Sequence, residues 1–133
     1  MKNKNYYGLI AQVGELSGAS MFEIQPKEFI EQKIKNILFY VVQISIEEKI
    51  KIKQYKIKQE NFESFHNLTI FASEIFGNQR MKIYDLKGTL NSFINCLWNI
   101  SNSYKLDFDK IIDLNLKQIN EFKNKKRKNF KNI

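Results

Sequence analysis

Two glutamates early in the chain have the residue type and the spacing that metal sites use. Glu28 and Glu31 are three residues apart, so a helix would place both carboxylates on the same face. Such a pair can supply oxygen ligands to a metal ion. It can equally face water in the first turn of a helix, where negative charge opposes the positive end of the helix dipole. The spacing leaves both interpretations open.

The other reactive side chains stand alone. His66 is the only histidine and Cys96 the only cysteine, so the sequence supports neither a Ser-His-Asp triad nor a Cys-His pair. A single cysteine excludes an intramolecular disulfide and a cysteine-based metal cluster. Its apolar helical neighbours predict that Cys96 is a small buried side chain. The chain also lacks a glycine-rich phosphate loop and a dinucleotide fingerprint.

The net charge of +8 belongs to the two ends of the chain. Without the eight basic residues of the two ends, the remaining 14 basic residues equal the 14 acidic ones. A neutral body argues against a nucleic-acid binder with a broad basic surface. The tail 123–133 could contact phosphates of RNA or DNA, or serve only as a frayed, solubilising terminus. The candidate phosphate contacts of the tail are Lys123, Lys125, Lys126, Arg127 and Lys128.

The body is predicted to be all-α and a single domain over residues 1–133. Apolar residues make up 43% of the chain, and one proline with five glycines leaves few helix breakers. Apolar side chains recur at helical spacing in residues 6–21, 27–43, 67–76 and 90–104, and again in 105–122 after a short polar joint. Asp107 and Asp109 suit the start of that last helix. The small residues Gly14 and Gly18 could let another helix come close.

No signal peptide or membrane span is expected. The first residues lack a long apolar segment, and the longest apolar run, residues 37–42, is far shorter than the ~20 residues that cross a bilayer. An intracellular, cytoplasmic location without membrane association is therefore the expectation. The sequence leaves oligomerisation open.

Residues 44–58 are the ambiguous part of the chain. Four isoleucines, Ile44, Ile46, Ile50 and Ile52, show a period of two that would suit a strand, but no partner strand with turn residues is evident. We interpret this stretch as a helix. Its lysines at positions 49, 51, 53, 56 and 58 would then form a wet face balanced by nearby glutamates.

An internal repeat supports the helical interpretation of residues 44–58. Shifting the chain by 59 residues aligns units 6–63 and 65–122, with 11 identities over residues 8–63 where composition alone would give roughly 5. Each unit would hold a short helix, a long apolar helix and a Lys-rich amphipathic helix. Generic helices rich in Ile, Lys and Asn are the alternative explanation. A true duplication predicts a helical bundle with pseudo-twofold symmetry.

The segment 90–122, LNSFINCLWNISNSYKLDFDKIIDLNLKQINEF, resembles the second half of the MazG-like nucleotide pyrophosphohydrolases, which are all-α. The similar features are Leu97 and Trp98 in an apolar run, the polar joint, the following run 106–111, and then Asn115 and Lys117. Upstream, NLTIFASEIFG at 67–77 is similar to the preceding helix of that family. The resemblance covers about half of the chain and, through the repeat, the rest more faintly.

The resemblance implies a Mg²⁺ site made by carboxylates at i and i+3 on two facing helices, which grips a triphosphate for hydrolysis between the α and β phosphates. By position the ligands fall on Phe71, Glu74, Ser92 and Asn95, and in the first half on Gln12, Glu15, Lys33 and Asn36. Only Glu15 and Glu74 are acidic. The resemblance therefore predicts these two as remnant metal ligands, sharing one site across the pseudo-twofold. Lys33 would repel a dication.

Two functions follow as hypotheses. In the first, the chain is a divergent MazG-like protein, impaired in hydrolysis, that binds a nucleotide or a protein partner. In the second, it is a non-enzymatic helical module that binds nucleic acid or protein through the basic tail.

Overall fold

The computed structural model describes residues 2–54, 56–77 and 83–117 of the 133-residue chain. Four long helices account for most of this part: α1 (Lys2–Ser20), α2 (Lys27–Glu47), α3 (Asn61–Gly77) and α4 (Ile83–Ser103). A fifth helix covers residues 108–117 within the described region. The described ranges contain no strand, and the predicted all-α class is confirmed.

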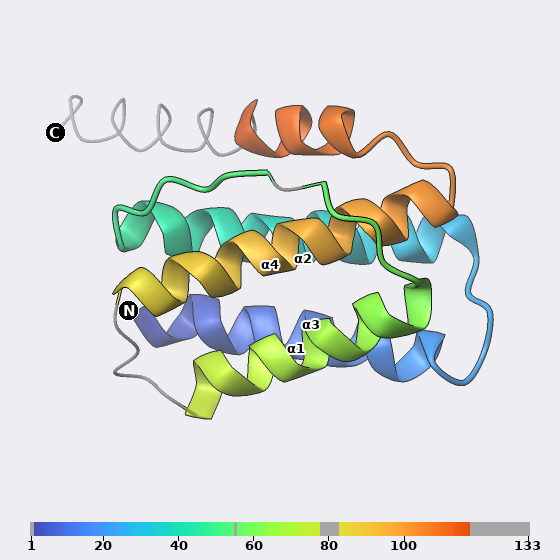
Figure 1. Ribbon diagram of the computed structural model, residues 1–133, viewed down its shortest axis with the longest axis horizontal. Coiled ribbons are helices and arrows are strands. Elements are labelled where there is room, and N and C mark those ends of the chain that lie inside the picture. Colours follow the sequence, from blue (N-terminus) through green and yellow to red (C-terminus); the bar gives the residue numbers. More distant parts are fainter. Residues whose placement is uncertain (1, 55, 78–82, 118–133) are drawn as a thin grey trace, which may run out of the picture.

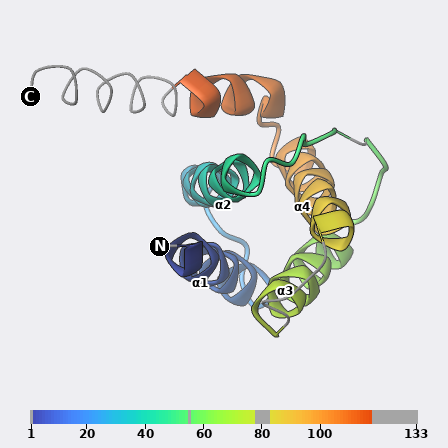
Figure 2. The same cartoon turned by 90° about the vertical axis from the view of Figure 1, so that its left-hand side faces the viewer.

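The four long helices form one bundle. Helix α1 packs against α2 and α3, and α4 packs against α3 and α2 (Figure 2). Each of these neighbouring pairs is antiparallel, because α1 and α4 run one way and α2 and α3 the other (Figure 1). The link from α2 to α3 therefore has to run along the bundle, and its described residues do so (Figure 1). We call the described residues of this link, 50–54 and 56–60, the strap.

The core follows from the apolar spacing of the sequence. Helix α1 contributes Leu9, Val13 and Leu16, which are all at most 1% exposed. Helix α4 is buried around most of its circumference, with seven apolar and several polar residues below 9% exposure. A helix covered on so many sides lies at the centre of the packing. In the described region, no helix combines the length and the hydropathy that a bilayer crossing requires.

The fifth helix begins as its acidic residues predict. Asp107 precedes it, and its Oδ1 accepts a hydrogen bond from the Lys110 amide at 3.2 Å. Phe108 and Ile111 are buried, and Asn115 Nδ2 donates to the Lys35 carbonyl of α2 at 3.1 Å. The fifth helix thus packs against α2. Its continuation to residue 122 and the tail 123–133 fall beyond the part of the chain described.

The helix predicted for residues 44–58 is wrong beyond residue 47. Helix α2 ends in a Schellman motif, in which the Ile50 amide donates to the Ser45 carbonyl at 2.8 Å and Lys49 has a positive φ of 56°. Ile50 is buried beneath this turn. The described residues of the strap have no regular secondary structure. The buried isoleucine after the turn closes the motif, and this tertiary contact overrides the local helical pattern.

Helix α4 ends in the same motif. The Leu106 amide donates to the Ser101 carbonyl at 2.8 Å, and Lys105 has a φ of 57°. Helices α2 and α4 also have equal lengths of 21 residues. Their bounds and their C-terminal turns correspond at an offset of 56 residues, whereas Leu9 and Leu68 in α1 and α3 correspond at the expected 59.

The predicted three-helix repeat unit does not hold for the first half. Its third element is the strap, while residues 108–117 of the second half are helical. Identities such as Lys51 with Lys110 and Ile52 with Ile111 therefore pair a strap residue with a helical one. Two helical hairpins, α1–α2 and α3–α4, are what the halves share. Duplication itself remains a prediction.

The close approach of α1 and α2 occurs at Gly8. A Cβ atom added there would overlap the Tyr40 ring, whereas nothing lies within 4 Å of one added at Gly14 or Gly18. The expectation that Gly14 and Gly18 allow a helix to come close is therefore wrong.

Candidate functional site

Four side chains on the facing surfaces of α1 and α2, those of Gln12, Glu15, Lys33 and Asn36, form a polar cluster, and Gln32 of α2 joins its edge. Lys33 Nζ makes an ion pair with Glu15 and donates to Gln12 Oε1 at 3.3 Å. Asn36 Nδ2 donates to the same Gln12 oxygen at 3.0 Å, and Gln32 Nε2 donates to Asn36 Oδ1 at 2.9 Å. These residues come together because each helix presents positions i and i+3 on one face.

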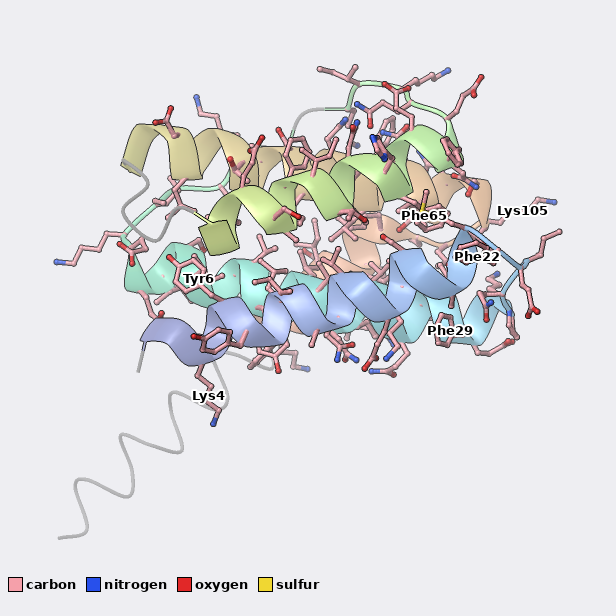
Figure 3. The ribbon with its side chains drawn as sticks, turned by 90° about the horizontal axis from the view of Figure 1, so that it is seen from below. Lys4, Tyr6, Phe22, Phe29, Phe65 and Lys105 are labelled. Carbon is pink, nitrogen blue, oxygen red and sulfur yellow. The ribbon has the colours of Figure 1, made fainter. Side chains whose placement is uncertain are left out.

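The positive charge of this cluster is the Lys33 ammonium. Its side chain is 17% exposed, that of Glu15 is 56% exposed, and the ammonium also lies 5.6 Å from the centre of the Phe29 ring. Figure 3 shows Phe29 near the end of the bundle that carries Phe22 and Lys105, away from Tyr6 and Lys4. The ammonium takes the oxygen atoms of Gln12 and Glu15 as its own partners, so the cluster is electrically satisfied without an added cation.

The second-half positions to which the resemblance assigns metal ligands do different things. The Phe71 ring packs edge-on against Phe93 at 5.9 Å between centroids, and Ser92 Oγ donates to the Gly88 carbonyl of its own helix. Asn95 binds the strap. Glu74 is exposed on α3. The second half therefore has no polar cluster like that of the first half in the residues described.

The predicted metal ligands Glu15 and Glu74 lie on different helices, α1 and α3. Glu15 pairs with Lys33 of α2, whereas Glu74 is exposed on α3, and a site shared by the two stays a prediction. No group of three or more His, Cys, Asp or Glu side chains suited to a metal occurs in the same ranges. Glu28 lies in the first turn of α2, and Glu31 pairs with Lys35 at 3.5 Å on the helix surface.

Three asparagines of α4 form a feature that sequence reasoning missed. Asn91, Asn95 and Asn99 accept hydrogen bonds from the backbone amides of Lys53, Ile57 and Gln59, at 2.8, 2.9 and 2.8 Å. Asn99 Nδ2 also donates to the Ile57 carbonyl at 2.8 Å. We call these three residues the asparagine ladder. Each is at most 6% exposed, so the strap covers them.

The signal for the ladder is present in the sequence. The spacing of four residues, twice repeated, puts all three amides on one side of a helix, with apolar residues between them. Buried amides need partners, and a backbone that lies outside regular structure supplies them. The helical interpretation of the strap concealed this match, because a helix satisfies its own backbone amides.

Side chains complete the attachment of the strap. Lys56 pairs with Asp109 of the fifth helix at 3.9 Å, and Cys96 Sγ lies 3.9 Å from Gln59 Oε1. Burial, followed by the charge of Glu63, raises the pKa of the Cys96 thiol to about 12. The prediction that Cys96 is buried is confirmed, and its environment disfavours a thiolate.

The remaining predicted residues contribute no site to the described region. His66 is exposed on α3. The basic residues Lys123, Lys125, Lys126, Arg127 and Lys128 lie outside the ranges that the structure describes. No family model, curated protein or solved structure matches the chain.

Proposed function

We propose that this chain is a divergent MazG-like protein that no longer hydrolyses nucleotides and instead binds a nucleotide or a protein partner. The observation that supports the proposal is the polar cluster between α1 and α2. Gln12, Glu15, Lys33 and Asn36 are the first-half positions to which the resemblance assigns metal ligands, and they contact one another. The same contacts explain why a metal would be lost there.

Electrostatics disfavours Mg²⁺ in this cluster. A dication about 4 Å from the Lys33 ammonium would be repelled by about 8 kcal/mol at the effective dielectric constant typical of a protein surface. Only Glu15 supplies a negative charge among the four residues. Mg²⁺ usually relies on carboxylates and keeps near-ideal octahedral geometry, so one carboxylate beside an ammonium is a poor site.

The proposal is tested by activity and binding with the full chain. We expect no Mg²⁺-dependent release of pyrophosphate from a panel of nucleoside triphosphates. We also expect at least one nucleotide to raise the melting temperature, because a ligand that binds only the folded state stabilises it. Turnover would overturn the loss of hydrolysis. Unchanged melting with every nucleotide would remove nucleotide binding from the proposal.

A variant with restored carboxylates tests the role of the cluster. The triple variant Gln12→Glu, Lys33→Glu, Asn36→Asp should gain stabilisation by Mg²⁺ or Mn²⁺ that the natural chain lacks, because four carboxylates would then face one another. The control Lys27→Glu, Gln54→Glu, Asn102→Asp changes the charge equally at exposed positions. Equal metal stabilisation of both variants would contradict a latent site.

The basic tail favours a second candidate, a non-enzymatic module that binds nucleic acid or protein. Six basic residues and no acidic residue occur in the last eleven positions. Phosphate binding by such a tail would weaken steeply with salt. Deleting residues 123–133 should then abolish binding to RNA or DNA. Binding that survives the deletion would reject the tail as the contact.

A further inference from the structure

We propose that the strap is a docking surface for a short, acidic, extended segment of a partner protein. This inference goes beyond the proposed function and does not depend on it. It rests on three features of the strap: fixed attachment to α4, exposed lysines in it and just before it, and backbone groups that face away from α4. Figure 1 shows the strap running along α4 on the outside of the bundle.

The strap is held at three points along its length. The asparagine ladder accepts hydrogen bonds from the amides of Lys53, Ile57 and Gln59 at 2.8–2.9 Å, so the backbone is bound rather than free. Binding a segment in advance lowers the conformational entropy that a partner must overcome when it docks. The strap therefore presents its outer side as a preorganised surface.

Exposed lysines are frequent in the strap and just before it. Lys49, Lys51, Lys53, Lys56 and Lys58 are all exposed or half-buried, and of these the described contacts pair only Lys56, with Asp109 at 3.9 Å. Positive charge in a row attracts a negatively charged partner and raises its association rate. Glu47 and Glu48 precede the row, and Glu60 and Glu63 follow it. These glutamates limit the lysine-rich stretch to the length of a short peptide, and they would repel a longer polyanion.

The strap also has backbone groups that can form hydrogen bonds with a peptide. Asn99 and Asn95 bind the carbonyl and amide of Ile57, and Asn99 binds the amide of Gln59. The amides of Ile57 and Gln59 both point to α4, as those of alternate residues do in an extended chain, so the backbone groups of Lys58 between them face away from α4. The Lys58 amide has no partner among the described residues. Ile57, 63% exposed, adds an apolar contact beside it.

An acidic peptide satisfies all of these groups together. Its carboxylates face the lysines, an apolar side chain covers Ile57, and its backbone exchanges hydrogen bonds with Lys58 as an added strand does. A single-stranded nucleic acid would use the lysines alone. The lysines also discourage pairing of two straps with each other, since like charges would meet.

The experiment measures binding of two labelled probes to the full chain by fluorescence anisotropy. The first probe is a peptide of about ten residues that alternates glutamate and valine, long enough to span the lysine row. The second is an oligothymidylate of similar length. We expect the peptide to bind more tightly than the oligonucleotide, with affinity that falls as salt is added. No peptide binding up to about 1 mM, or tighter strap-dependent binding of the oligonucleotide, overturns the proposal.

Matched variants separate charge from backbone pairing. The triple variant Lys51→Gln, Lys53→Gln, Lys58→Gln should weaken peptide binding about tenfold, whereas Lys4→Gln, Lys27→Gln, Lys117→Gln removes the same charge elsewhere and should change it by less than about twofold. Lys58→Pro removes the outward amide and should weaken binding about fivefold relative to Lys58→Gln. Circular dichroism should verify that each variant is folded. Equal affinities of Lys58→Pro and Lys58→Gln would overturn strand addition.

Discussion

Asn99 makes the most hydrogen bonds of the asparagine ladder. It accepts from the Gln59 amide and donates to the carbonyls of Ile57 and Asn95. Asn99→Ala should lower the free energy of unfolding by about 1–3 kcal/mol, because it leaves partly buried backbone groups of the strap without partners. Urea denaturation measures this loss. The exposed Asn102→Ala is the control and should change stability by no more than about 0.5 kcal/mol. Equal effects of the two variants would contradict the anchoring role.

Cys96 predicts how stability depends on alkaline pH. Burial raises its pKa from 9.0, the ordinary value for a thiol, to about 12 in the fold. As pH rises above about 9, the unfolded chain loses this proton while the folded chain keeps it, so stability falls with pH. At about pH 10.5 the loss attributable to Cys96 is about 2 kcal/mol.

Urea denaturation at neutral and alkaline pH measures this dependence. Cys96→Ala should flatten the decline between about pH 9 and pH 12, although Tyr6, whose pKa burial and nearby Glu48 and Glu47 also raise to about 12, will keep part of it. An alkaline decline of the same steepness in Cys96→Ala would contradict the assignment. Alkylation of the thiol at neutral pH should be slow until the chain unfolds.

At the scale of single residues, the sequence predicted positions better than roles. The resemblance assigned one site on two facing helices to Gln12, Glu15, Lys33 and Asn36, and these residues do contact one another. It assigned Asn95 by the same rule, yet that side chain binds the strap. An asparagine on a helix looks the same in the sequence whether it meets water, a metal or a backbone. Only the path of a distant segment decides among these partners.

At the scale of the helices, the contact between α1 and α2 predicts different stability effects for alanine substitutions at the three glycines of α1. Gly8→Ala should destabilise the protein by about 1–3 kcal/mol, because the added Cβ overlaps the Tyr40 ring. Gly14→Ala should stabilise it by about 0.5–1 kcal/mol through helix propensity, since nothing lies nearby. Gly18→Ala, next to the end of α1, is expected to follow Gly14. Thermal unfolding of the three variants gives the comparison, and equal signs would contradict the close approach at Gly8.

The helices that the sequence predicted well are those with long apolar stripes. Helices α1, α2 and α4 lie where residues 6–21, 27–43 and 90–104 predicted them, with shifted ends. The stretch 44–58 was misjudged because its decisive interactions are remote in the chain. The strap is bound by residues 38–40 positions later, and no local pattern contains that information. The sequence comparison also used a single offset of 59 for both pairs of helices, although α2 and α4 correspond at 56. A shift of three residues leaves apolar side chains on nearly the same face of a helix, so the apolar pattern does not reveal the difference.

For the whole molecule, the central position of α4 predicts one cooperative unfolding transition. Helix α4 packs against α2 and α3 and binds the strap, so it connects the α1–α2 hairpin to the α3–α4 hairpin. Trp98 fluorescence, which reports α4, and far-ultraviolet circular dichroism, which reports all helices, should therefore give the same midpoint. Leu97→Ala should lower both midpoints together and cost about 3 kcal/mol, because Leu97 is fully buried. Two separated midpoints would show that the hairpins unfold independently.

The asparagine ladder has a consequence for the chain during its synthesis. The strap leaves the ribosome before the helix that holds it, because Asn91 and Asn99 lie 38 and 40 residues after their partners Lys53 and Gln59. At ordinary elongation rates that interval lasts roughly 2–8 s. During this interval the α1–α2 hairpin is followed by a lysine-rich segment whose backbone amides do not yet have their partners in α4. The charge of those lysines would then keep neighbouring nascent chains on the same message apart until α4 emerges.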